Sequence, residues 1–245
     1  MNSMQISDLI IIDKEEVKLE ELQLELSDRK SLLGLLRERS HLDQLHRYGL
    51  PATSKLLLHG SSGCGKTATA KAIAAALGKK LMILNLSNVI SARIGETAQH
   101  LKLVFDQASR EKCVLLLEEF DQIAKLRSIE DSDVGEMRRL VNSLIQLMDY
   151  FDDRALLICA TNHIAFIDPA ILRRFQLKIG YRLPMPLVLD DYYEKLLSAY
   201  PEQFRSIGRR YGISFAEARD HVLYRVKALI IEQIENDLIC EQKNN

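Results

Sequence analysis

Hydrophobic residues along this chain gather in short, uninterrupted runs that alternate with longer amphipathic stretches. Short apolar runs bounded by turns are typical of strands buried on both faces of a parallel sheet, whereas the longer stretches repeat with helical spacing. We therefore predict an α/β fold in which a five-stranded parallel sheet carries helices on both faces. The predicted strands are Lys55–His59, Leu81–Leu84, Val114–Leu117, Leu156–Ala160 and Leu177–Tyr181.

Both ends of the chain have a helical pattern. Apolar residues recur at helical spacing over residues 14–48, and the run Leu9–Ile12 before them is either a short strand or a docking segment. After the breaker Leu183–Pro186 the sequence is helical again, and Ser214 and Glu217 have the spacing of a capping box. We predict an N-terminal helical segment (1–48), a large α/β domain (49–186) and a small all-helical domain (187–245).

The composition is that of an ordinary globular protein, with a formal net charge of −1 over 245 residues. This balance provides no overall attraction to nucleic acid or to an anionic membrane, although a local basic patch is compatible with it. No stretch approaches the ~18 consecutive apolar residues of a membrane span, and no signal peptide is apparent. Four scattered cysteines without metal-ligand spacing favour a reducing, cytoplasmic location.

Residues 60–67 match the phosphate-binding pattern G-x-x-x-x-G-K-[ST], between a predicted strand and a helix-forming stretch. Its glycines let successive backbone N–H groups face phosphate oxygens at a helix N-terminus. Lys66 can reach the terminal phosphates, and the Thr67 hydroxyl can ligate Mg²⁺. The alternative, a glycine-rich turn that binds nothing, is disfavoured by this spacing and context. The predicted nucleotide-binding residues are Gly60, Ser61, Ser62, Gly63, Cys64, Gly65, Lys66, Thr67 and Ala68.

An acidic pair, Glu118 and Glu119, follows the predicted strand Val114–Leu117. Phosphoryl transfer to water needs a metal ligand and a group that polarises the attacking water, and two carboxylates at the end of a core strand can supply both. We predict that Glu118 holds Mg²⁺ and that Glu119 polarises the water. An acidic loop after a core strand is the alternative, which the phosphate-binding motif upstream makes less attractive.

From about residue 45 to its end, the chain resembles the AAA+ ATPases of the classical AAA branch, in particular small single-module members like those of bacteria. The matching blocks are Gly60–Thr67, Val114–Asp121, Ala160–Asn162 and Ile167–Phe175. The resemblance implies a P-loop NTPase fold with a helical lid, hydrolysis of ATP with Mg²⁺, and a homo-hexamer. It also implies that Asn162 senses the γ-phosphate and that Arg173 and Arg174 are arginine fingers acting on a neighbouring subunit's nucleotide.

Two positions depart from the pattern of that family. Glu118 stands where the family usually has Asp, so its carboxylate lies one methylene further from the backbone. Arg93 stands where polypeptide-threading members usually place a pore-loop aromatic residue. It either contacts an acidic or phosphate-bearing substrate or merely pairs with an acid such as Glu96. Asn85, after the second predicted strand, is a further candidate because the family often has a polar residue there that restrains the catalytic glutamate.

These features lead to three functional hypotheses. The first is a cytoplasmic ATPase ring that remodels or regulates a protein partner. The second is an ATPase linked to nucleic acid, motivated by Arg93 and the pair Arg138–Arg139 but not favoured by the near-neutral charge. The third is an ATP-binding switch with little hydrolysis, motivated by Glu118. No membrane association is expected.

Overall fold

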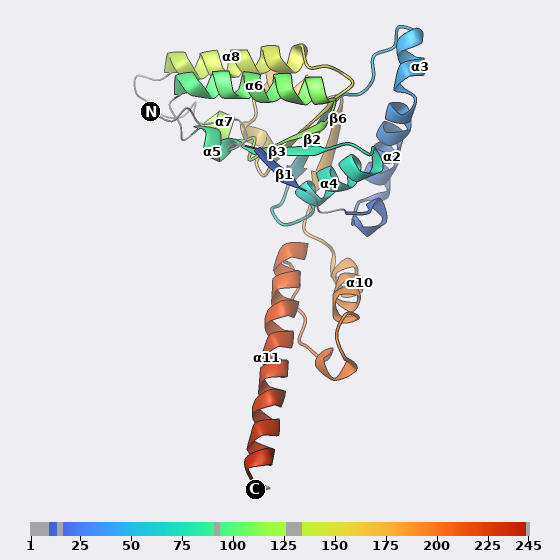
Figure 1. The fold of residues 1–245 in the computed structure, drawn as a ribbon, viewed down its shortest axis with the longest axis vertical. Coiled ribbons are helices and arrows are strands. Elements are labelled where there is room, and N and C mark those ends of the chain that lie inside the picture. Colours follow the sequence, from blue (N-terminus) through green and yellow to red (C-terminus); the bar gives the residue numbers. More distant parts are fainter. Residues whose placement is uncertain (1–9, 14–16, 91–93, 126–133, 244–245) are drawn as a thin grey trace. The chain divides into compact units, whose positions relative to one another are not determined.

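The computed structural model of the chain describes residues 10–13, 17–90, 94–125 and 134–243 (Figure 1). The chain divides into two compact units. Residues 1–60 and 65–181 form the first unit, and residues 61–64 and 182–245 form the second. The first unit has mixed α/β structure, whereas the second contains helices and turns within the described ranges.

A six-stranded sheet with the order β1-β3-β4-β5-β2-β6 forms the centre of the first unit. Its parallel strands are β2 (Lys55–Gly60), β3 (Leu81–Asn85), β4 (Val114–Glu118), β5 (Leu156–Thr161) and β6 (Leu177–Tyr181). These are the five predicted strands, so the predicted α/β fold is confirmed. β1 (Ile10–Asp13) joins as a sixth strand, antiparallel to β3, so the sheet is not purely parallel. Its short run could not reveal this edge pairing, because pairing partners lie far along the chain.

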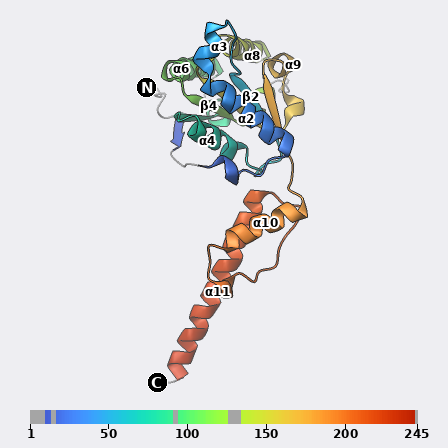
Figure 2. The ribbon, with the colours of Figure 1, turned by 90° about the vertical axis from the view of Figure 1, so that its right-hand side faces the viewer.

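Helices cover both faces of the sheet (Figures 1 and 2). α6 (Ile94–Glu111) and α8 (Val134–Asp149) lie side by side on one face. α2 (Leu26–Ser40) and α4 (Lys66–Ala76) lie on the other. Shorter elements are α3 (Leu42–Arg47), α5 (Leu86–Ile90), α7 (Gln122–Lys125), α9 (Pro169–Leu172), and the 3-10 turns η1 (Leu19–Glu21) and η3 (Ile164–Phe166).

Among the described residues of the stretch predicted to be helical, the first α-helix begins at Leu26. Arg29, within α2, donates from Nη2 to the carbonyl oxygen of Leu22 over 2.7 Å. Leu22 precedes the helix and is buried. Leu22 is therefore buried outside any α-helix, directly after the 3-10 turn η1, which hydrophobic spacing alone could not distinguish.

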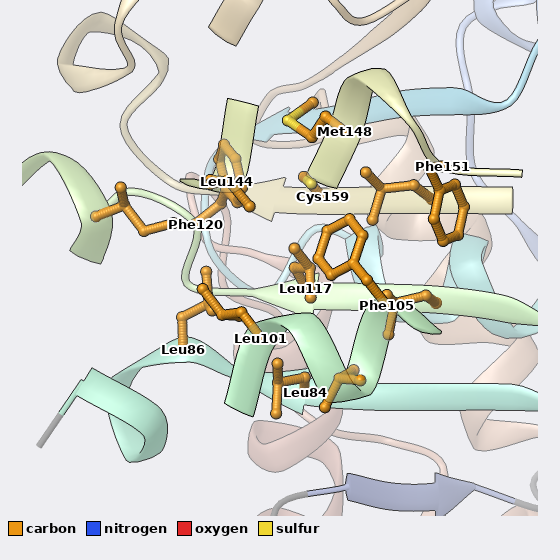
Figure 3. Close-up of a cluster of buried hydrophobic side chains, with 14 of the residues drawn as sticks. Leu84, Leu86, Leu101, Phe105, Leu117, Phe120, Leu144, Met148, Phe151 and Cys159 are labelled. Atoms are coloured by element: carbon orange, nitrogen blue, oxygen red, sulfur yellow. The ribbon is translucent and has the colours of Figure 1, made fainter. Parts of the chain in front are cut away.

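The main core lies between the sheet and the α6–α8 pair (Figure 3). Figure 3 labels Leu84, Leu117 and Cys159 on the strands and Leu101, Phe105, Leu144 and Met148 on the helices. Phe105 packs edge-on against Phe151, with 5.4 Å between ring centroids. Each fully buried side chain of this size contributes about 1.5–3 kcal/mol. The strands are therefore held rigidly, and so are the polar residues at their carboxyl ends.

The second unit pairs α10 (Pro186–Leu197) with the long helix α11 (Phe215–Lys243), joined by a segment that contains η4 (Glu202–Phe204). Its core residues are Leu189, Tyr193, Leu197, Ala218, Val222 and Val226. The predicted capping box is confirmed, because Ser214 N donates to Glu217 Oε2 over 2.8 Å and Glu217 N donates to Ser214 Oγ over 3.3 Å. In the same unit, Ala216 N donates to the Gly63 carbonyl oxygen over 3.1 Å. None of the helices described here combines the length and apolarity needed to cross a membrane.

Candidate functional site

The glycine-rich loop begins where β2 ends and finishes where α4 begins. Gly60, Gly63 and Gly65 have φ angles of 122°, 69° and 105°, which residues with a side chain rarely adopt. A Cβ atom at Gly60 would lie 2.0 Å from the carbonyl oxygen of Tyr181, so no larger residue fits there. Backbone turns of this kind form concave groups of N–H donors that bind anions. The loop therefore fits the phosphate groups of a nucleotide.

The first turn of α4 provides further anion-binding groups. Gly65 is its N-cap and no side chain caps the helix. The first N–H groups of a helix have no intrahelical acceptor, and together with the helix dipole they favour phosphate. Lys66 donates from Nζ to the carbonyl oxygen of Gly60 over 2.7 Å, so its ammonium group lies against the loop. A cationic side chain at that place suits phosphate oxygens.

Two buried hydroxyl groups fix the position of this loop. The Tyr181 hydroxyl donates to Thr69 Oγ1 over 2.6 Å, and Thr69 Oγ1 donates to the carbonyl oxygen of Gly65 over 3.0 Å. Burial raises the pKa of the Tyr181 hydroxyl well above its ordinary value, so it stays protonated. Because its backbone also packs against Gly60, Tyr181 contacts one end of the loop directly and the other through Thr69. The sequence contained no motif that marked either residue.

The metal-binding candidates come together at the end of β4. Thr67 Oγ1 donates to Oε1 of Glu118 over 2.5 Å, although the two residues are 51 positions apart. Mg²⁺ prefers oxygen ligands and is commonly held by one or two protein side chains together with substrate phosphates. A hydroxyl beside a carboxylate fits that ion. Among the described residues, no group of three or more His, Cys, Asp or Glu could hold a metal ion by itself.

Glu119 has an unusual backbone conformation and a clear side-chain partner. Its φ angle is 54°, in the left-handed region that costs a residue with a side chain about 1–3 kcal/mol. Its side chain is exposed, and Ser87 Oγ donates a hydrogen bond to its Oε2. Asn85, considered as the restraining residue, instead accepts a hydrogen bond of 2.9 Å from Ser87 N. Ser87 therefore contacts the glutamate, and Asn85 orients Ser87.

Asp121 joins the carboxyl ends of β4 and β5. Its buried Oδ1 accepts a hydrogen bond of 2.9 Å from Thr161 Oγ1 and a longer one of 3.4 Å from Asn162 N. One residue earlier, Phe120 N donates to the Ala160 carbonyl oxygen over 2.9 Å. These bonds hold the exposed Asn162 next to the segment that carries the acidic pair. Asp121 lay inside a recognised block without an assigned role, and its only signal was a charge beside an apolar run.

The two predicted arginine fingers differ in their surroundings. Arg174 donates from Nε and Nη2 to the two carboxylate oxygens of Asp149 over 2.7 and 2.8 Å. This hydrogen bonding raises the pKa of Arg174 and lowers the pKa of Asp149. Arg173 is exposed and pairs with no acidic residue in the part of the chain that the structure describes. Arg93 and the side chain of Arg138 lie outside the described residues, so the inferences from them stay predictions.

Comparison with known proteins decides the family. A sequence model described as "ATPase family associated with various cellular activities (AAA)" matches residues 56–183. The chain belongs to the AAA family. The predicted membership is thereby confirmed. The matched region of this AAA chain includes most of β2, the phosphate-binding loop, the acidic pair and β6.

Three relatives show how far the similarity extends. This AAA chain is 34% identical over 216 residues to the uncharacterized AAA family ATPase y4kL of Sinorhizobium fredii, covering 87% of the chain and 65% of that protein. It is 33% identical over 144 residues to the 26S proteasome subunit RPT4 of Saccharomyces cerevisiae, covering 57% and 33%. It is 32% identical over 176 residues to a nuclear valosin-containing protein-like protein of Mus musculus, covering 69% and 20%. The chain thus spans less than two thirds of each relative.

Proposed function

We propose that this AAA protein hydrolyses ATP with Mg²⁺ and works as a homo-hexameric ring that remodels or regulates a protein partner. The hydrogen bond between Thr67 and Glu118 carries the catalytic part of this proposal. It supports a metal site formed by both residues, because Thr67 belongs to the phosphate-binding loop and Glu118 directly precedes the exposed Glu119. The same bond argues against a switch with little hydrolysis, since the longer Glu118 side chain still reaches Thr67.

Each site residue has a role in this proposal. Residues 60–68 bind the phosphates through backbone N–H groups and Lys66, while Thr67 and Glu118 hold Mg²⁺. When bound, this ion would neutralise charge on the phosphate oxygens. Glu119, which Ser87 holds in place, orients and deprotonates the attacking water. Asn162 hydrogen-bonds the water or the γ-phosphate from the end of β5.

The ring is supported by the availability of Arg173. An exposed guanidinium that has no acidic partner among the described residues can donate to developing phosphate charge on a neighbouring subunit. One relative, RPT4, is named as a subunit of the 26S proteasome, and we infer by similarity that this chain also acts within an assembly of several subunits. Cys113 and Cys159 are buried free thiols, in keeping with the proposed cytoplasmic location.

The variant Glu119→Gln tests the proposal. It should retain ATP binding and lose hydrolysis by about 100-fold or more. In native mass spectrometry with ATP it should form hexamers, and from its own cells it should retain a protein partner that a Lys66→Ala control does not. Wild-type turnover in Glu119→Gln would contradict the proposed catalysis. A chain that stays monomeric with ATP would contradict the ring, and equal recovery of proteins by both variants would contradict the remodelling role.

A further inference from the structure

A basic pocket lies at the amino end of the sheet, in the first unit. Its volume is about 600 Å³, and its lining includes Arg39, Lys79, Lys112 and Arg154 together with the acid Asp43. The candidate catalytic residues follow the carboxyl ends of the same strands, where ligands of open parallel sheets bind. The pocket therefore lies at the opposite end of the strands from the candidate catalytic residues. The net charge of −1 does not reveal this local excess of positive charge.

Three of these cations occupy equivalent positions just before three adjacent strands. Lys79, Lys112 and Arg154 each stand two residues before the first residue of β3, β4 and β5, which are Leu81, Val114 and Leu156. Those first residues are in register across the three strands. Neighbouring strands lie about 4.8 Å apart, so the sheet arranges the three cations in a row along its edge.

The fourth cation in the lining, Arg39, is buried. It donates to the carbonyl oxygens of Thr53 over 2.8 Å and of Arg154 and Ala155 over 3.0 Å. Lys79 also donates to the Arg154 carbonyl oxygen, so two cations converge on one acceptor. Burial lowers the pKa of both cations, and for Lys79 the charge of Arg39 lowers it further. Within the described part of the chain, no carboxylate forms an ion pair with Arg39 or Lys79, so an anion would complete this arrangement.

The nearby acids do not supply that partner. Asp43, the acid in the lining, lies 3.9 Å from Arg154, at the limit of an ion pair. Three further acids offset the charge from outside the pocket, but their oxygens accept other hydrogen bonds: Glu38 from Thr53, Asp152 from the Arg154 N–H, and Asp153 from Ala52 and His46. Lys112 has a φ angle of 50°, at a helix end where Gly or Asn is usual. The side chain of Lys112 is exposed and thus accessible to a ligand.

We propose that this pocket binds a small, multiply charged anion that carries phosphate groups. Each phosphate offers several acceptor oxygens, and charge-assisted hydrogen bonds to Lys79, Lys112 and Arg154 would relieve the repulsion among them. A concave site of this volume suits a compact molecule better than the continuous backbone of a nucleic acid. The inference stands apart from the proposed hydrolysis, because it uses none of the residues of the nucleotide site.

Calorimetric titration of the full chain with sodium tripolyphosphate at low salt tests the proposal. The titration is made in a Lys66→Ala background, so that the phosphate-binding loop contributes little. Lys112→Gln and Arg154→Gln, both at exposed positions, should each weaken binding by about fivefold. Lys80→Gln is the matched control, because Lys80 is exposed, pairs with Glu111 and is outside the lining. It should leave binding unchanged.

The outcomes are separable. Tripolyphosphate binding that disappears with Lys66→Ala, or that survives Lys112→Gln and Arg154→Gln undiminished, would overturn the proposed site. A single-stranded oligonucleotide that binds more tightly than tripolyphosphate and depends on the same two residues would overturn the assignment to a small molecule. With Lys66 intact, Lys112→Gln and Arg154→Gln should keep wild-type ATP hydrolysis. Failure of the proposed ATPase function would instead appear as absent turnover in the wild type.

Discussion

Arg174 forms a bidentate ion pair with Asp149 at the end of α8, 25 positions earlier in the sequence. The neighbouring Arg173 has no such partner among the residues described. Two adjacent arginines that one family motif treats as a pair therefore have different environments. Arg173 is exposed, as the proposed role on a neighbouring subunit requires, whereas Arg174 already binds its own chain and positions the segment that follows α9.

Replacing each arginine by alanine should separate these roles. Arg173→Ala should lose most ATP hydrolysis with an unchanged midpoint of thermal unfolding, because its side chain is exposed. Arg174→Ala should also destabilise the chain, by up to about 1 kcal/mol. Mixing Arg173→Ala with Glu119→Gln subunits should restore part of the activity, because some interfaces then combine an intact glutamate with an intact finger. No recovery on mixing would argue against action between subunits.

The Asp149–Arg174 pair should stabilise the fold in a pH-dependent way. The hydrogen bond from Arg174 lowers the folded-state pKa of Asp149 below its unfolded value of about 4. Its contribution is therefore present above that value and is lost as the pH falls through the folded-state pKa. Asp149→Asn should cost up to about 1 kcal/mol of unfolding free energy at neutral pH, since water screens this exposed pair. The cost should vanish in strong acid, and a constant difference in urea unfolding across this range would contradict the assignment.

The charge of Glu118 should be needed for the metal. Glu118→Gln keeps the length of the side chain and an acceptor for the Thr67 hydroxyl, but it removes the negative charge. We expect a folded protein whose half-saturating Mg²⁺ concentration for hydrolysis rises about tenfold or more. A magnesium titration at saturating ATP measures this directly. An unchanged magnesium requirement would show that Glu118 is not a metal ligand.

The Tyr181 hydroxyl should stabilise the phosphate-binding loop. Tyr181→Phe removes its hydrogen bond to Thr69 and should lower the unfolding free energy by about 1 kcal/mol. Nucleotide affinity, measured with a fluorescent ATP analogue, should fall severalfold, because Thr69 would be less well placed against Gly65. Tyr150→Phe is the control, since Tyr150 is 88% exposed. Equal effects in the two variants would show that the Tyr181 hydroxyl does not stabilise the phosphate-binding loop.

Two glycine substitutions should act in opposite directions. Gly60→Ala places a Cβ atom 2.0 Å from the Tyr181 carbonyl oxygen at a φ angle of 122°, so it should abolish nucleotide binding or folding. Gly34→Ala adds a methyl group within α2, where nothing lies within 4 Å. It should raise the unfolding free energy by about 0.5–1 kcal/mol. Thermal unfolding and nucleotide binding of both variants check this pair, and a stable, nucleotide-binding Gly60→Ala would show that the loop conformation is wrong.

Much of the fold followed from local patterns. The apolar runs predicted β2 to β6, because a strand buried on both faces needs a continuous hydrophobic stretch wherever it is placed. β1 was left open between a strand and a docking segment, since its pairing with β3 depends on residues 70 or so positions away. The turn around Leu22 resembled a helix because burial by long-range packing leaves the same spacing of apolar residues as an amphipathic helix.

The candidate site divides in the same way. Gly60–Thr67, Glu118 and Glu119 could be predicted because a phosphate-binding loop and a strand-end carboxylate impose local requirements on residue type and spacing. The sequence could not predict the roles of Ser87, Asp121, Thr69 and Tyr181. A Ser, Thr, Asp or Tyr outside a motif has many possible roles, and only its contacts in the folded chain show which one it has. The same holds for Arg174, whose choice of Asp149 depends on how α8 and α9 are placed.

The sequence by itself thus determined the family, the order of the strands along the chain and the residues proposed to carry phosphate chemistry. Only the tertiary structure decided which side chains hold those residues in position, which of the two arginines pairs with Asp149, and that Lys79, Lys112 and Arg154 stand in a row. The reason is physical. Backbone conformation and hydrophobic periodicity are encoded over a few residues, whereas hydrogen bonds and charge clusters arise between strands that meet only when the sheet has formed.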